Sequence, residues 1–228
     1  MNPDALLLID NFDSFTYNIV HLLRSLGVPL EDIDVVRNTR LRLGELPRYR
    51  AVISSPGPGL PETSGALLPA VELCLRKNIP YFGICLGLQA LGMAAGGKLR
   101  RLDEVQHGVQ HECDVVERDR LLAGLPDRFD VGRYHSWVID EETAPTNLRV
   151  LASTEGGVIQ AVAHRTAPAY GVQFHPESIM SPESGPAILR NFLQIAHGIE
   201  PDAEVLAGDG DALADDGAPA APVTNIAA

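Results

Sequence analysis

A cysteine flanked by two glycines, in the run Gly83-Ile-Cys85-Leu-Gly87, is the strongest candidate for covalent chemistry in this chain. The apolar residues 79–84 before it predict a buried strand, and residues 86–94 after it have a helical pattern. Glycines two positions before and after a nucleophile permit a sharp strand-to-helix turn that presents its side chain. Free N–H groups at the start of the helix would favour a thiolate there. The alternative is a small buried cysteine in a tightly packed corner of the core.

A second candidate constellation is His175-Pro-Glu177, which follows the apolar run of residues 170–174. In extended backbone, residues i and i+2 point to the same side, so Glu177 could orient the imidazole and stabilise its charged form. The three side chains would then form a triad in the order Cys85, His175, Glu177, with the histidine accepting and returning a proton. The alternative is a capped strand end that carries a surface ion pair.

The elements that must position these residues alternate between strands and helices in the first half of the chain. We expect strands at residues 6–9, 33–37, 51–54 and 79–84, and helices at residues 14–26, 64–77 and 86–94. Such alternation predicts an α/β fold with a central, mostly parallel sheet flanked by helices. After Gly97 the pattern changes to short strand-like runs at residues 98–102, 112–116, 129–140, 148–153, 158–164 and 170–174, followed by a helix at residues 183–197. These runs predict additional β-structure, including antiparallel strands, beside the central sheet.

An irregular loop follows the third predicted strand, in Ser55-Pro-Gly-Pro-Gly-Leu-Pro61. Its prolines and glycines exclude a regular element. It begins at the carboxyl end of a strand, which is the edge where open α/β sheets bind ligands. A glycine there can present an unobstructed N–H to a ligand oxygen. The alternative is a rigid surface loop.

Composition narrows the class of protein. The chain has 228 residues and a net charge of −12, and half of that charge lies in six acidic residues after residue 200. This balance argues against nucleic acid or an anionic membrane as the main partner. We expect one domain at residues 1–199 and a disordered acidic tail at residues 200–228. Three cysteines do not form a disulfide framework, and we see neither a membrane span nor a signal peptide, so a cytoplasmic location is the default.

The remaining histidines suggest little further chemistry. His107 and His111 are four residues apart and Cys113 is nearby, but no fourth ligand stands out, so we expect no metal site. His135 interrupts an apolar run, in Arg133-Tyr-His-Ser-Trp137, and its loop could border the reactive site.

Five stretches together resemble the class I glutamine amidotransferases, which have a flavodoxin-like domain. They are Asp10-Asn-Phe-Asp-Ser-Phe-Thr-Tyr-Asn18, Ser55-Pro-Gly-Pro-Gly59, Gly83-Ile-Cys-Leu-Gly87, Arg133-Tyr-His-Ser136 and Gly171-Val-Gln-Phe-His-Pro-Glu-Ser178. The first stretch is typical of the glutaminase component (component II) of anthranilate synthase and of aminodeoxychorismate synthase.

The resemblance implies that Cys85 attacks the carboxamide of L-glutamine and that ammonia passes to a chorismate-binding synthase subunit (component I), without cofactor or metal. It also implies oxyanion donors at the backbone of Gly59 and Leu86. The implied glutamine-binding residues are Gly57, Pro58, Gly59, Leu86, Gln89, Ser136 and Trp137. Pro58 has no N–H and cannot donate. Gln89 lies one helical turn after Cys85, on the same face.

Two residues depart from the family pattern. Leu88 stands where the family usually has histidine, and we expect it to bear on partner coupling or loop packing. Val109 stands where the family commonly has lysine, and we expect it to bear on partner contacts or substrate gating. Tryptophan synthesis, through anthranilate, and folate synthesis, through aminodeoxychorismate, both fit the motifs. A non-catalytic regulatory subunit is a second hypothesis. A third is a different thiol hydrolase, such as a peptidase or a γ-glutamyl hydrolase, acting without a synthase.

Overall fold

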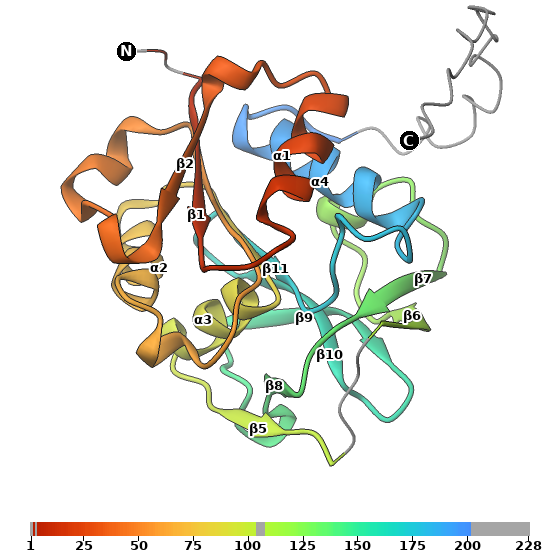
Figure 1. Ribbon diagram of the computed structural model, residues 1–228. Helices are drawn as coiled ribbons and strands as arrows, with labels where there is room; N and C mark the ends of the chain where they lie inside the picture. The colour runs from red at the N-terminus through yellow and green to blue at the C-terminus, as the bar shows by residue number, and fades with distance from the viewer. Residues whose placement is uncertain (1, 3, 104–107, 202–228) are drawn as a thin grey trace, which may run out of the picture.

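A nine-stranded mixed sheet runs through the centre of the molecule in the computed structural model of the chain (Figure 1). The structure describes residue 2, residues 4–103 and residues 108–201. The strand order is β2-β1-β3-β4-β11-β10-β9-β6-β7, and β5 and β8 form a separate two-stranded sheet. The strands are β1 (Leu6–Asp10), β2 (Ile33–Arg37), β3 (Ala51–Ser54), β4 (Tyr81–Ile84), β5 (Leu99–Arg101), β6 (Val109–Val115), β7 (Arg128–Arg133), β8 (Trp137–Ile139), β9 (Leu148–Thr154), β10 (Ile159–His164) and β11 (Ala169–Val172). The α-helices are α1 (Thr16–Ser25), α2 (Leu67–Lys77), α3 (Leu86–Ala94) and α4 (Ser184–Ala196).

The five strands from β2 to β11 in this order are parallel to one another. Leu8 of β1, for example, is in register with Val35 of β2 and with Ile53 of β3. Their carboxyl ends therefore meet at one edge of the sheet, so the segments that follow β1, β3, β4 and β11 lie together. The predicted α/β class is confirmed.

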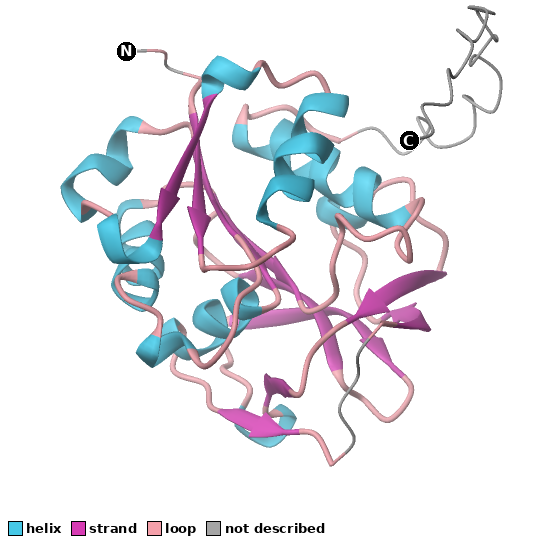
Figure 2. Ribbon diagram, in the orientation of Figure 1, coloured by secondary structure: helices cyan, strands magenta, loops and turns pink. Residues whose placement is uncertain are grey.

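Helices cover both faces of this parallel half (Figure 2). On one face α1 and α4 pack their buried residues, such as Ile19 and Phe192, against Phe82 of β4. The rings of Phe82 and Phe192 are 5.0 Å apart. On the other face α2 and α3 contribute Val71 and Leu91 to a second apolar cluster. Each fully buried side chain of this size stabilises the fold by about 1.5–3 kcal/mol.

The remaining strands extend the sheet with antiparallel pairs. Our prediction of one strand over residues 129–140 is wrong, because β7 ends at Arg133 and β8 begins at Trp137 in the smaller sheet. β7 lies at the edge of the large sheet. The chain after it can therefore leave that sheet and form β8, which pairs with β5. Ser136 in the connecting loop accepts a hydrogen bond from the Leu102 N–H (2.8 Å).

Two helix boundaries differ slightly from those predicted. α2 begins at Leu67, because Gly65 has a φ of +57°, which a right-handed helix cannot accommodate. α1 begins after Phe15 without a side-chain cap, although the Asp13 carboxylate accepts a hydrogen bond from the Phe15 N–H (2.7 Å). Within the described residues no helix is long and apolar enough to cross a membrane. The predicted disordered tail lies outside them from residue 202 onward.

Candidate active site

Cys85 lies at a strained turn between β4 and α3. Its φ is +52° and its ψ is −99°, a region that costs a residue with a side chain about 1–3 kcal/mol. A Cβ atom on Gly83 would lie 2.3 Å from the Gly87 carbonyl carbon, and one on Gly87 would lie 2.9 Å from the Cβ of Ser54. Both glycines are thus required by close backbone packing, and the predicted sharp strand-to-helix turn is confirmed. The Cys85 N–H donates to the Val172 carbonyl (2.8 Å), which ties the turn to β11.

His175 and Glu177 meet in a turn that follows β11. The His175 Nδ1 and Glu177 Oε1 atoms are 2.7 Å apart, and both side chains are buried. We predicted the contact but not its geometry: the backbone is not extended there, because the Ser178 N–H bonds to the His175 carbonyl and closes a turn. The second Glu177 oxygen, Oε2, is buried without a hydrogen-bond partner among the described residues. A buried carboxylate of this kind strongly favours a positive charge on its neighbour.

The electrostatics of His175 suit a proton carrier. Burial alone would lower the pKa of its imidazole, but hydrogen bonds and charge interactions with Cys85 and Glu177 outweigh burial and raise that pKa to about 10. The Cys85 thiol therefore lies near the ring, although the buried His175 Nε2 atom makes no hydrogen bond to a described residue. The ring can be held as an imidazolium beside a thiolate, which is the arrangement that thiol nucleophiles need.

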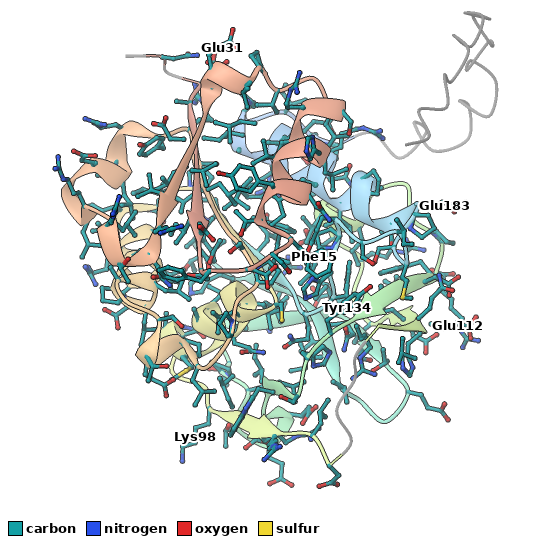
Figure 3. All side chains as sticks on the ribbon, in the orientation of Figure 1. Phe15, Glu31, Lys98, Glu112, Tyr134 and Glu183 are labelled. Carbon is teal, nitrogen blue, oxygen red and sulfur yellow. The ribbon has the colours of Figure 1, made fainter. Side chains whose placement is uncertain are left out.

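Two aromatic rings enclose the imidazole. The Tyr134 ring centroid lies 4.8 Å and the Phe15 centroid 6.0 Å from that of His175. Figure 3 shows Phe15, at the start of α1, and Tyr134, in the loop after β7, side by side, with centroids 5.8 Å apart. The Tyr134 hydroxyl is also hydrogen-bonded to Ser178 Oγ (3.0 Å). These contacts fix the plane of the imidazole and shield it from solvent.

Asn11 holds the Pro-Gly loop that follows β3. Its side-chain N–H groups donate to the Ser55 carbonyl (2.7 Å) and to Ser54 Oγ (3.0 Å). A Cβ atom on Gly57 would lie 2.6 Å from the Cβ of Asn11 and 3.0 Å from a methyl group of Leu86. The loop therefore packs directly on the first residue of α3.

The candidate oxyanion donors lie on both sides of this contact. Leu86 is the first residue of α3, and a helix leaves the N–H of its first residue without an intrahelical partner. Gly59 has a φ of +82°, which favours glycine. Between Gly57 and Gly59, Pro58 restricts the backbone and contributes no donor.

Gln89 links α3 to the start of β8. Its N–H bonds to the Cys85 carbonyl (3.0 Å), so the two side chains are one helical turn apart, as predicted. Its side-chain Nε2 donates to the Trp137 carbonyl (2.8 Å). The structure thus brings together Gln89, Trp137 and the neighbouring Ser136, which are distant in sequence.

His135 is unsuited to the proton-carrying role. Burial, together with the nearby charges of Arg133 and His175, lowers its pKa to about 3. Its Nε2 accepts a hydrogen bond from Arg133 Nε (3.2 Å), so the ring is neutral at ordinary pH. Across residues 4–103 and 108–201, no three His, Cys, Asp or Glu side chains gather to hold a metal. Of the histidines considered for metal binding, His107 lies outside the described residues.

The two departures from the family pattern lie in different surroundings. Leu88 is fully buried in the apolar cluster of α2 and α3, and it faces Gly171 of β11. Val109 begins β6 and is 41 % exposed. Leu88 is thus part of the core beneath the site, whereas Val109 is a surface residue.

Sequence reasoning missed four residues that contact the site: Asn11, Phe15, Tyr134 and Gln173. Asn11 directly follows a buried strand at its carboxyl end, which is a signal for a site residue. Gln173 precedes His175 by two positions, and the same-side rule applied to that pair could also have selected it. The aromatic contacts depend on tertiary packing and have no comparable local signal.

Comparison with known proteins agrees with this geometry. The family model for "Glutamine amidotransferase class-I" matches residues 7–196. Anthranilate synthase component 2 of Azospirillum brasilense is 43 % identical over 197 residues, covering 86 % of this chain and 98 % of its own. The chloroplastic anthranilate synthase beta subunit 1 of Arabidopsis thaliana is 45 % identical, covering 83 % and 70 %.

Solved structures show the same fold. A candidate GMP synthase subunit from Thermoplasma acidophilum has a TM-score of 0.76 and 26 % identity, and the match covers 87 % of this chain and 96 % of that one. The chain therefore belongs to the class I glutamine amidotransferases and is an amidotransferase enzyme.

Proposed function

We propose that this chain is the glutaminase subunit of an anthranilate synthase. It would hydrolyse L-glutamine and deliver the ammonia to a chorismate-binding synthase subunit. The observation that carries the proposal is the convergence of Cys85, at its strained turn, with the buried His175–Glu177 pair. The names of the relatives reported above support anthranilate as the product.

The first half of the reaction would form a thioester. Cys85 Sγ attacks the carboxamide carbon of glutamine, and His175 takes up the thiol proton. The carbonyl oxygen becomes an oxyanion, which the N–H groups of Gly59 and Leu86 would stabilise; losing one such donor costs about 10²–10³ in rate. His175 then gives its proton to the departing nitrogen, the C–N bond breaks and ammonia leaves.

The second half would release glutamate. A water molecule attacks the thioester carbon while His175 accepts one of its protons. The C–S bond then breaks, and the proton returns to the sulfur. Glu177 accepts the hydrogen bond of His175 Nδ1 and would stabilise the imidazolium that forms in both halves.

The substrate would lie between α3 and the loop after β7. Gln89 and the backbone of Ser136 and Trp137 offer polar groups for the amino-acid end of glutamine, and Gly57, Pro58 and Gly59 line the opposite side. The Gln89–Trp137 hydrogen bond supports this assignment, because it already joins the two walls. We also place the protein in the cytoplasm, in keeping with its three buried, unpaired cysteines.

The test measures glutamate release from glutamine by the chain alone, and then with chorismate and a chorismate-binding synthase subunit. Release should rise with the partner and should vanish in Cys85→Ala. Cys74→Ala is the matched control, because it removes a buried thiol of α2 that lies outside the site.

The product of chorismate tests the pathway. Anthranilate is expected, whereas aminodeoxychorismate would move the protein to folate synthesis. Release that persists in Cys85→Ala, or no release with any synthase, would contradict the proposed function. Coupled synthesis that survives loss of the thiol would favour a regulatory subunit instead.

A further inference from the structure

A buried glutamine contacts the proposed nucleophile. Gln173 directly follows β11, and its side chain is fully shielded from solvent. Its Nε2 atom donates a hydrogen bond to Cys85 Sγ over 3.5 Å. We propose that Gln173 is a further catalytic residue, whose amide N–H stabilises the Cys85 thiolate. This inference deepens the proposed glutaminase function and rests on it.

Neighbouring hydrogen bonds fix which end of the Gln173 amide faces the sulfur. The Gln89 amide must present its NH₂ group to the Trp137 carbonyl, which can only accept (2.8 Å). The same NH₂ group donates to Gln173 Oε1 (3.4 Å). If the nitrogen and oxygen of the Gln173 amide exchanged places, its NH₂ group would face the NH₂ group of Gln89, and its oxygen would face the Cys85 sulfur. The chain of hydrogen bonds from Trp137 through Gln89 therefore keeps the Gln173 N–H on Cys85.

Burial makes this hydrogen bond effective. A hydrogen bond to a charged group is stronger than one between neutral groups, and a poorly solvated site strengthens it further. Because Cys85 is only 6 % exposed, water cannot easily replace the Gln173 donor. Loss of the donor should therefore lower the thiolate population at a given pH by about tenfold.

Other groups near the sulfur can titrate, whereas Gln173 cannot. The titratable side chains on the segments that meet at Cys85 come from three places: His175 and Glu177 follow β11, Arg133, Tyr134 and His135 lie at the end of β7, and Tyr81 and Tyr170 lie on β4 and β11. The Tyr170 hydroxyl accepts a hydrogen bond from Arg120 and not from the site. The Tyr81 hydroxyl donates to the Gly87 carbonyl (2.9 Å) and not to the sulfur. α3 carries no titratable side chain. Removal of Gln173 should thus shift the existing pH profile without adding a new ionisation.

The test is the rate of Cys85 alkylation by iodoacetamide across pH, measured on the full chain without glutamine. Gln173→Met keeps the side-chain length and removes the donor. We expect alkylation at pH 7 to slow about tenfold and the profile to move to higher pH. Cys74 and Cys113 contribute little background, because burial raises the pKa of each thiol to about 12. Cys85→Ala measures that background directly.

Gln160→Met is the matched control. Gln160 is equally buried, lies on the adjacent strand β10, and accepts the Gln173 N–H at its backbone carbonyl (2.8 Å). Its side-chain amide makes no hydrogen bond to a described residue. This variant should keep the alkylation profile of the unaltered protein. A Gln173→Met profile that overlays that of the unaltered protein would overturn the proposal.

A second variant guards against a failure to fold. Gln173→Glu has the shape of the original residue but places a carboxylate beside the sulfur, so its alkylation should be slower still. An unchanged rate in this variant would also overturn the proposal. Because alkylation needs neither glutamine nor a synthase, it separates this inference from the proposed function, whose failure would appear as absent glutamate release.

Discussion

The two halves of the large sheet position the candidate site by different means. In the parallel half, Cys85 is placed by backbone packing that leaves no space at Gly83 or Gly87. At the end of the antiparallel half, the chain leaves β7 through a loop, and Trp137, the first residue of β8 in the smaller sheet, accepts a side-chain hydrogen bond from Gln89. Cys85 is thus placed by the packing of the sheet itself, whereas the wall expected to bind glutamine is held by contacts between separate elements.

The largest expected effect tests the close packing in the parallel half of the sheet. Gly83→Ala would place a methyl group 2.3 Å from the Gly87 backbone, so it should destabilise the protein by more than about 4 kcal/mol or prevent folding. Urea unfolding measures this loss. Gly44→Ala is the control, because no atom lies within 4 Å of a Cβ there, and it should be close to neutral. A Gly83→Ala protein as stable as the control would show that the turn is not tightly packed.

The parallel half of the sheet could be predicted from the sequence more accurately than the antiparallel half. Strands β1 to β4 were predicted to within a residue or two, because each is a short apolar run bounded by Gly, Pro or polar residues. The turn at Cys85 was predicted from its two glycines. The split between β7 and β8 was not, since an edge strand can end wherever its chain finds another partner.

In the candidate site, contacts between residues close in sequence could be predicted, whereas contacts between distant residues could not. The His175–Glu177 contact was predicted, although through the wrong backbone geometry. The contact between Gln173 and Cys85 joins residues 88 positions apart and exists because β4 and β11 pair in parallel. No local pattern encodes such a contact. The roles assigned to Gly57, Gly59 and Ser136 in binding glutamine remain predictions.

A second prediction concerns the junction of the two halves, where His175 lies. Glu177→Gln keeps the shape of the side chain and leaves a buried imidazolium unpaired, so it should cost about 3–5 kcal/mol at pH 6. The pKa of His175 is raised on folding, from about 6.5 to about 10. The contribution of this charge to the free energy of unfolding is therefore fully present below pH 6.5, and it is lost as pH rises through 10.

Urea unfolding of both proteins between pH 6 and pH 10 checks this sign. The difference between the unaltered protein and Glu177→Gln should be largest at pH 6 and should shrink toward pH 10. A difference that grows with pH would mean that His175 is neutral in the folded protein.

A third prediction compares the two departures from the family pattern. Leu88→Ala should cost about 2–5 kcal/mol, because it opens a cavity in the apolar cluster under the site. Val109→Ala, at the exposed start of β6, should change stability by less than about 0.5 kcal/mol. Thermal and urea unfolding would measure both. Equal effects would contradict the assignment of Leu88 to the core.

The smallest expected effect comes from relieving backbone strain at Cys85. Cys85→Gly should be more stable than Cys85→Ala by about 1 kcal/mol, because glycine accepts the positive φ that alanine does not. Neither variant should release glutamate. Equal stability of the two would indicate that the turn at Cys85 stores no strain.

The most direct test of the central claim is to locate the covalent intermediate. The chain and its synthase partner would be given radiolabelled glutamine, quenched in acid during turnover, digested and analysed by mass spectrometry. The account predicts a γ-glutamyl thioester on the peptide that contains Cys85, and none in Cys85→Ala. Glutamate release without label on Cys85, or label on another residue, would contradict it.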